Sequence, residues 1–226
     1  MNQQETFEWP GWPLSENPFG EEFDAPARKR MVTGSQMLIP LLEKYRPEMG
    51  TNILEIGPFF NPLTTPKSFP NTEIFYWEND RHVIEHLNRQ FKKLPAYCIY
   101  SDLNRIDGTS LLQLKEQTTK HFSSLGQAGG RFDVVVMSHL FNYTDYRLLL
   151  IILKAFIQPN ALIFINNVVN YGLPNFFSEK RPLSIEETVE SIKGTGYDVL
   201  ESQIIPSTFP EHQKNPRLLL VAKNTN

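Results

Sequence analysis

One apolar run that ends in a carboxylate and a glycine has the clearest chemistry in this 226-residue sequence. It reads Asn52-Ile-Leu-Glu-Ile-Gly-Pro-Phe-Phe-Asn-Pro62. Parallel α/β proteins bind nucleotide-like ligands where such strands end, and Gly57 allows backbone angles that a side chain forbids. A second carboxylate, Glu78, follows about twenty residues later, after another apolar segment, which is the usual spacing for a group that binds a ribose.

Alternating apolar segments would place these residues at one edge of a sheet. We expect strands at 52–56, 73–77, 96–100, 132–137 and 161–165, and a final pair at 197–205 and 218–222. We expect helices at 27–45, 80–91, 109–122, 143–157 and 184–194. Asp80 suits a helix N-cap, Ser184 and Glu187 form a capping box, and Pro40 either kinks or divides the first helix. The pattern predicts an α/β fold, a three-layer α/β/α sandwich around a mainly parallel sheet.

Composition bounds the class of protein. The formal net charge is −3, so nothing indicates a general affinity for nucleic acid. A single cysteine, Cys98, excludes an intramolecular disulfide framework and a cysteine-cluster zinc site. No basic segment followed by an apolar run marks a secretory signal, and no apolar run is long enough to span a bilayer. We therefore expect a soluble, cytoplasmic protein with neither nucleic acid nor membrane as a partner.

The chain divides into an N-terminal aromatic arm and helix over 1–46 and a main domain over 47–226. Residues 1–26 are irregular and acidic but contain aromatic residues such as Trp12 and Phe19, which disordered segments usually lack. An arm that docks on the domain as a lid is one interpretation, and a loose terminal tail is the other. The oligomeric state stays open, including a homodimer in which two copies exchange their arms.

The order of these features resembles the class I S-adenosylmethionine-dependent methyltransferases over about residues 52–223. The four strand ends of that family are matched by Leu54-Glu-Ile-Gly57, Tyr76-Trp-Glu78, Ser101-Asp-Leu103 and Phe132-Asp-Val-Val-Val-Met-Ser-His139. The family's terminal strand pair is matched by residues 196–201 and 217–222. The resemblance implies a Rossmann-like, seven-stranded sheet with an antiparallel last strand. It also implies S-adenosyl-L-methionine as cofactor and S-adenosyl-L-homocysteine as its product.

The resemblance assigns roles to the residues at the strand ends. Glu78 would accept hydrogen bonds from the ribose hydroxyls, and Glu55 would hold the turn or the amino acid head of the cofactor. Asp102 would accept from the adenine amino group, or else cap the turn that follows it. The residues expected to bind the cofactor are Glu55, Gly57, Pro58, Phe59, Asn61, Glu78, Asn79, Asp102, Leu103, Ser138 and His139. The family's turn commonly has several glycines, whereas only Gly57 stands here, so the binding of the amino acid head stays open.

Methyl transfer from a sulfonium requires mainly that the acceptor is positioned and that water is excluded. A general base is needed only where the acceptor loses a proton, and His139 and Tyr143 are the catalytic candidates. For His139, contact with the cofactor and a purely structural role are the alternatives. The residues expected to bind the substrate are Trp12, Phe19, Asn142, Tyr143, Asn166, Asn167 and Tyr171. This aromatic set with few polar groups favours a small molecule or a short peptide as acceptor.

Residues 165–172 resemble the segment after a strand in the metal-dependent catechol-type O-methyltransferases. Asn166 and Ser138 stand where those enzymes have carboxylates, and magnesium binds mainly anionic oxygens, so we expect no metal. No Asn-Pro-Pro-Tyr motif follows the fourth strand, so we expect no nucleic-acid substrate. The sequence therefore predicts an enzyme that methylates an O or N atom of a small molecule or short peptide, with secondary metabolism as one setting. The alternatives are a non-methylating reaction on the same fold, such as a cyclisation, and a silent binding subunit.

Overall fold

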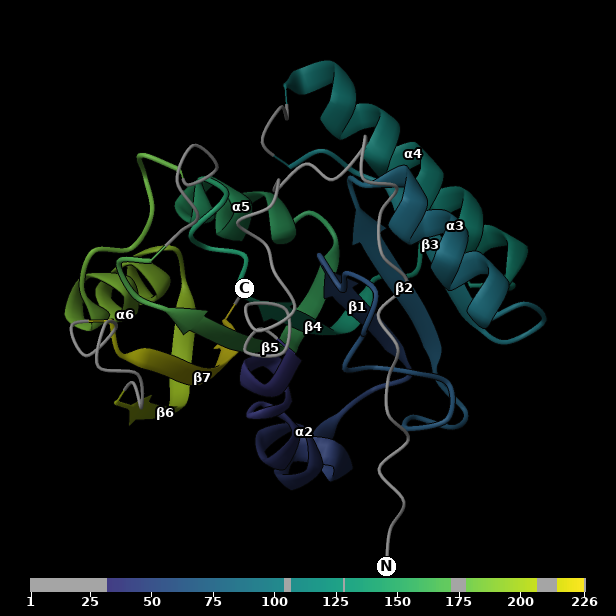
Figure 1. The fold of residues 1–226 in the computed structure, drawn as a ribbon. Coiled ribbons are helices and arrows are strands. Elements are labelled where there is room, and N and C mark those ends of the chain that lie inside the picture. The colour runs from purple at the N-terminus through teal and green to yellow at the C-terminus, as the bar shows by residue number, and fades with distance from the viewer. Residues whose placement is uncertain (1–31, 104–106, 128, 172–177, 207–214, 226) are drawn as a thin grey trace, which may run out of the picture.

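The computed structural model describes residues 32–103, 107–127, 129–171, 178–206 and 215–225, which form one sheet with helices on both faces (Figure 1). The strands are β1 Asn52–Ile56, β2 Glu73–Glu78, β3 Ala96–Tyr100, β4 Phe132–Ser138, β5 Ile157–Val168, β6 Tyr197–Ile205 and β7 Arg217–Asn224. The helices are α2 Ile39–Tyr45, α3 Arg81–Gln90, α4 Gly108–Ser124, α5 Tyr146–Leu153 and α6 Ile185–Gly194, with a short 3₁₀ turn η2 at Arg46–Glu48. No helix in these ranges is long and apolar enough to cross a membrane.

The sheet has seven strands in the order β3-β2-β1-β4-β5-β7-β6. Strands β1 to β5 pair in parallel, whereas β7 runs antiparallel to both β5 and β6. The predicted Rossmann-like sheet with an antiparallel last strand is confirmed. One edge of the sheet therefore collects the carboxyl ends of β1 to β5 and the first residue of β7.

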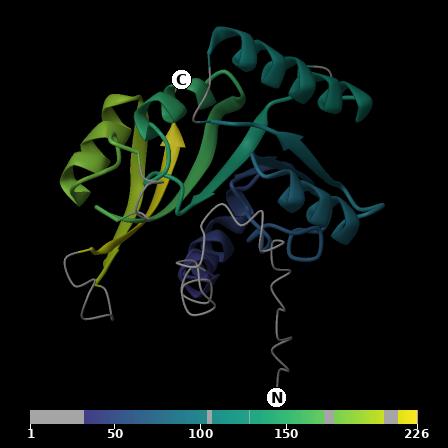
Figure 2. The same cartoon turned by 45° about the horizontal axis from the view of Figure 1, so that its top comes forward.

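Two apolar clusters cover the two faces of the sheet. Helices α4, α5 and α6 pack on one face, where Leu54 of β1 is buried, and α2 and α3 pack on the other, where its neighbour Ile53 is buried. Figure 2 shows α2 and α3 on one side of the strands and α4 to α6 on the opposite side. Because both faces are covered, the central strands are apolar without alternation. Leu41 and Leu42 of α2 belong to the second cluster, so this helix is part of the layer that covers the sheet.

Three elements differ most from those predicted. The helix expected at 143–157 is only Tyr146–Leu153, because the Asp145 side chain accepts from the Leu148 amide and caps the helix there. The strand expected at 161–165 starts at Ile157, which pairs with β4 before an irregularity in the register. Pro40 divides the first helix. Residues 32–36 are helical, a turn follows, and α2 begins with Pro40 in its first turn, where a missing amide costs no hydrogen bond.

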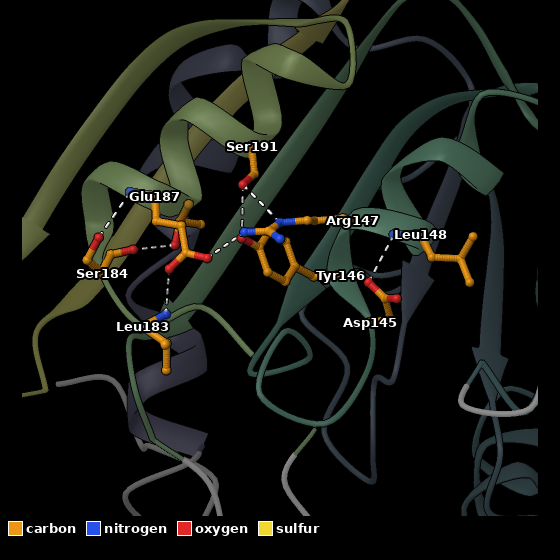
Figure 3. A network of polar contacts seen from close by, with 9 residues as sticks. Asp145, Tyr146, Arg147, Leu148, Leu183, Ser184, Glu187 and Ser191 are labelled. Carbon is orange, nitrogen blue, oxygen red and sulfur yellow. Dashed lines mark hydrogen bonds and ion pairs between the residues drawn. The ribbon is translucent and has the colours of Figure 1, made fainter. Parts of the chain in front are cut away.

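Polar contacts join α5 to α6 on the outside of the sandwich (Figure 3). The Ser184 side chain accepts from the Glu187 amide at 3.0 Å, which confirms Ser184 as the N-cap of α6 and forms the first half of the predicted capping box. The Glu187 carboxylate accepts from the Leu183 amide at 3.3 Å and forms an ion pair with Arg147. Ser191 completes the contact by accepting from Arg147 at 3.1 Å. Exposed ion pairs contribute little to stability, so this network mainly orients the two helices.

A substitution at Leu54 tests how much the packing of strand β1 contributes to stability. Its side chain is fully buried, so Leu54→Ala should lower the free energy of unfolding by about 2–5 kcal/mol, as core leucine truncations do. Leu112→Ala is the matched control because Leu112 is 69% exposed on α4. Urea unfolding followed by circular dichroism would measure both. Equal effects of the two substitutions would contradict the assignment of Leu54 to the core.

Candidate functional site

The carboxylate of Glu55 fixes the loop that follows β1. Its side chain is 3% exposed and accepts from the Leu63 amide at 2.9 Å, the Thr64 amide at 2.8 Å and the Thr64 hydroxyl at 2.6 Å. The Tyr76 hydroxyl donates to the Thr64 carbonyl from the neighbouring strand. Of the two roles predicted for Glu55, the geometry shows the one that holds the turn.

Gly57 starts this loop with a left-handed backbone. Its φ is +62°, and its amide donates to the Trp77 carbonyl at 2.8 Å, which binds the loop to the end of β2. Phe59 also has a positive φ, +58°, which is unusual for a residue with a side chain. The Phe60 ring is buried and packs against His86 of α3 at a centroid distance of 5.5 Å. The Phe60 side chain of this loop therefore packs into the apolar layer between the sheet and α3.

Glu78 at the end of β2 joins the loops that follow two strands. It is 5% exposed, and its Oε1 accepts from the amides of Asn79 at 2.8 Å and Asp80 at 3.0 Å. Its Oε2 accepts from the Phe59 amide at 3.3 Å, a long bond that joins the loops after β1 and β2. A carboxylate oxygen has two acceptor sites, so Oε2 is the oxygen with room for a further donor.

Burial dominates the electrostatics of both carboxylates. It raises the pKa of Glu55 to about 7, against the opposing effect of the hydrogen bonds from Thr64 and Leu63. It likewise raises the pKa of Glu78 to about 7, against the amides of Asp80, Asn79 and Phe59. Both groups therefore titrate near neutral pH.

The end of β3 lies beside Glu78. The Ser101 amide donates to the Glu78 carbonyl at 2.9 Å, and the Ser101 hydroxyl is buried without a hydrogen-bond partner among the described residues. Asp102 and Leu103 follow, both half-buried, and Leu103 packs against the cluster under α4 and α5. An unpartnered buried hydroxyl is costly, and here it lies at the carboxyl edge of the sheet.

The ends of β4 and β5 are joined through His139 and Asn166. His139 is buried with φ +58°, and its amide donates to the Asn166 carbonyl at 2.7 Å. The Asn166 side-chain amide donates to the Gly34 carbonyl at 2.7 Å, and the Ser138 hydroxyl lies 3.0 Å from that of Ser35. Residues 32–36 therefore cover this part of the edge.

Arg217, the first residue of β7, is a site residue that the sequence analysis missed. Its Nη1 donates to the Asn166 side-chain oxygen at 2.6 Å and to His139 Nε2 at 3.2 Å. An arginine cannot accept a hydrogen bond, so His139 Nε2 is the acceptor in this contact. The available signal was topological, because a cation at the start of an antiparallel last strand lies at the carboxyl ends of its parallel neighbours.

The residues predicted to bind the substrate differ in burial and in their hydrogen bonds. Asn142 and Asn167 are buried, and both side-chain amides donate to the Val168 carbonyl, at 2.7 and 2.9 Å. Tyr143 and Tyr171 are half-buried.

The remaining predicted residues differ in exposure. Pro58 is buried, Asn61 is half-buried and Asn79 is exposed, while Trp12 and Phe19 lie outside the described residues. Within the described ranges, no group of three or more His, Cys, Asp or Glu side chains is arranged to hold a metal ion.

Known structures share this architecture. A 1,6-didemethyltoxoflavin-N1-methyltransferase from Burkholderia thailandensis, solved with S-adenosylhomocysteine, matches with a TM-score of 0.61 at 13% identity, over 91% of this chain and 84% of that chain. The N-methyltransferase NodS from Bradyrhizobium japonicum matches with a TM-score of 0.58 at 12% identity, over 90% and 99% of the two chains. The cyclase SpnF matches with a TM-score of 0.60 at 10% identity, over 84% and 81%. The fold is that of the class I methyltransferases. The sequence itself matches no protein-family pattern and no curated protein.

The pKa of Glu55 predicts how stability depends on pH. Between its ordinary value of 4.5 and its folded value of about 7, the folded chain holds a proton that the unfolded chain has released. Stability from this group is therefore complete below the lower value and is lost as the pH rises through the upper one. The advantage of the wild type over Glu55→Gln should shrink by about 3 kcal/mol across this range, at about 1.4 kcal/mol per pKa unit.

Urea unfolding of both proteins at constant ionic strength, from about pH 5 to about pH 8, would measure this difference. The comparison between variants is needed because burial lowers the pKa of His86 and of His121, which gives a slope of opposite sign in the wild type. An advantage that grows with pH would show that the hydrogen bonds from Thr64 and Leu63 outweigh burial.

Proposed function

We propose that this chain is an S-adenosylmethionine-dependent methyltransferase that acts on an O or N atom of a small molecule or short peptide. The observation that carries the proposal is the row of polar groups at the carboxyl edge of a methyltransferase-type sheet, from Glu55 and Glu78 to His139. The structural likeness to N-methyltransferases at TM-scores of 0.58 and 0.61 supports the same reading. A ligand in this fold binds at that edge.

The residues at this edge fit the cofactor. Glu78 Oε2 has room to accept from a ribose hydroxyl, and the unpartnered Ser101 hydroxyl would gain a polar partner beside it. Asp102 and Leu103 would face the adenine, and the Gly57 turn would lie along the amino acid head. Because Oε1 of Glu78 already accepts from two amides, we propose one hydroxyl contact rather than the two expected from the sequence.

The cofactor supplies a methyl group on a positively charged sulfur. The task of this chain is then to orient the acceptor and to exclude water, since the methyl group is already activated. His139 and Tyr143 lie on the acceptor side of the edge. A role of His139 as general base through Nε2 would require the contact with Arg217 to break first, because that contact uses the lone pair of Nε2.

The side chains on the acceptor side of the edge indicate the kind of acceptor. Asn166 and Ser138 replace the carboxylates of metal-dependent relatives, so we propose a mechanism without a catalytic metal. Among the similar structures, one is named as a 1,6-didemethyltoxoflavin-N1-methyltransferase and another as a glycopeptide N-methyltransferase. Both names are compatible with a small-molecule or short-peptide acceptor for this chain, with neither nucleic acid nor membrane as a partner.

A non-methylating reaction is the second candidate. It is favoured by the likeness to the cyclase SpnF, whose TM-score of 0.60 equals that of the methyltransferases within a few hundredths. A silent binding subunit on the same fold is the third. Transfer of the methyl group separates the first candidate from both others, whereas binding of the cofactor does not.

Turnover of S-adenosylmethionine labelled on its methyl group tests the reaction. We expect label to move to at least one member of a panel of small amines, phenols and short peptides, with one S-adenosylhomocysteine formed per methyl group transferred. Product analysis by mass spectrometry would check this. Binding of the cofactor without any transfer across the panel would contradict the methyltransferase proposal, and absence of binding would remove the cofactor as well.

A substitution at Glu78 tests its proposed hydrogen bond with a ribose hydroxyl of the cofactor. Glu78→Ala should weaken S-adenosylhomocysteine binding by roughly 2–3 kcal/mol, the range for hydrogen bonds to a charged group, as measured by calorimetry. Glu116→Ala, on the exposed part of α4, is the control and should leave binding unchanged. A cofactor analogue without ribose hydroxyls separates contact from loop damage, because it should bind the wild type and Glu78→Ala alike. A loss below a few tenths of a kcal/mol with S-adenosylhomocysteine would exclude Glu78 as the ribose ligand.

A further inference from the structure

Arg217 places a positive charge at the acceptor side of the site. It begins β7, where it pairs with Val168 of β5 and Ile205 of β6. Its side chain reaches across β5 toward β4, because Nη1 donates to both Asn166 and His139. The guanidinium therefore lies beside the residue that directly follows β4, on the side away from Glu78.

In the described part of the chain, the guanidinium has only neutral hydrogen-bond partners. Both hydrogen-bond partners of Nη1 among the described residues are uncharged, an amide oxygen and an imidazole nitrogen. Within the part of the chain that the structure describes, no carboxylate forms an ion pair with Arg217. Desolvation lowers the pKa of Arg217 to about 10, which still leaves the group protonated at neutral pH. A half-buried cation with no anionic partner is costly, so a functional reason for it is expected.

The donors that remain are suited to an oxyanion. A guanidinium has five N–H groups in a planar fork, and only Nη1 makes hydrogen bonds to the described residues. The fork geometry matches the two oxygens of a carboxylate or phosphate. Asn166 fixes the orientation of this fork, since its side chain also donates to the Gly34 carbonyl.

The Gly34 backbone lies against the same guanidinium. A Cβ at position 34 would be 2.4 Å from Arg217 Nη2, a distance that real Cβ atoms do not show. The charge is therefore covered on one side by backbone and bound on another by Asn166 and His139. This arrangement keeps the guanidinium at the site instead of allowing it to extend into solvent, as an unconstrained surface arginine would.

We propose that Arg217 binds an anionic oxygen group, a carboxylate or a phosphate, on the methyl acceptor. The inference rests on the proposed function, because it identifies the acceptor class of that same edge. Arg217 would then select acids over their neutral analogues and fix the acceptor beside His139. Such a contact would leave cofactor binding at Glu78 and the Gly57 turn unaffected.

Matched pairs of acid and neutral probes test this on protein saturated with S-adenosylhomocysteine. The pairs are acetate with acetamide, benzoate with benzamide, and phenyl phosphate with phenol, which together distinguish carboxylate from phosphate. Ligand-observed NMR titration at constant ionic strength measures each affinity. For at least one pair, we expect the acid to bind roughly tenfold to a hundredfold more tightly, as for hydrogen bonds to a charged group.

Three variants identify the residue responsible. Arg217→Gln should abolish the preference for the acid, and Arg217→Lys should keep part of it because the charge remains while the fork is lost. Arg131→Gln is the control, because Arg131 is exposed and precedes β4 at the opposite edge of the sheet, so the same change in net charge should leave the preference intact. If Arg217→Gln does not fold, the wild type and Arg217→Lys still give a result.

The outcomes separate this inference from the proposed function. Equal affinities for acid and neutral probes in all three pairs, or an acid preference that persists in Arg217→Gln, would overturn the anion site while S-adenosylhomocysteine still binds. If S-adenosylhomocysteine itself does not bind by calorimetry, the proposed function fails first and the inference fails with it. Unchanged S-adenosylhomocysteine affinity in Arg217→Gln, together with lost acid preference, is the result that supports both.

Discussion

The contact on which the rest of the site depends is the buried carboxylate of Glu55 with the Leu63 and Thr64 backbone. The loop between β1 and β2 contains one glycine and four prolines, so it has few conformations, and this carboxylate selects one of them. Once the loop is fixed, the Phe59 amide lies within reach of Glu78, and the ends of β1 and β2 form one unit. Without Glu55, the two buried amides of Leu63 and Thr64 would lack an acceptor. The main role of this carboxylate is therefore to hold the loop, and its charge is secondary.

Sequence patterns predicted the parts of the fold that depend on local chemistry. The apolar run before Gly57 and the cap at Asp80 each report a local preference, and the structure has both the strand and the helix. The predicted start of the helix expected at 143–157 was wrong because the side chain of Asp145 caps the helix and decides where it begins, and periodicity alone does not contain that information. The role of Glu55 in holding its turn was one of two alternatives, and only the geometry distinguishes them.

The contacts that could not be predicted connect residues far apart in sequence. Arg217 meets His139 and Asn166 only because β7 is antiparallel and lies next to β5. Nothing in the run that begins at Arg217 marks it as more than the first residue of an apolar strand. Likewise, the Asp80 amide donates to Glu78 Oε1 and uses an acceptor site of that oxygen. The spacing between Gly57 and Glu78 in the sequence does not reveal this contact.

The position of β7 between β5 and β6 has a consequence for the order in which the two halves of the site form. The side-chain hydrogen bonds of Glu55 and Glu78 to the described residues all lie within residues 55–80, so the loops after β1 and β2 can form soon after that segment is synthesised. The acceptor side needs Gly34 and Arg217 together, 183 positions apart, and thus nearly the whole chain. Closing so long a loop is slow, because its entropy is lost before any contact rewards it. The nascent chain would therefore have the Glu55–Glu78 framework well before it has a place for an acceptor.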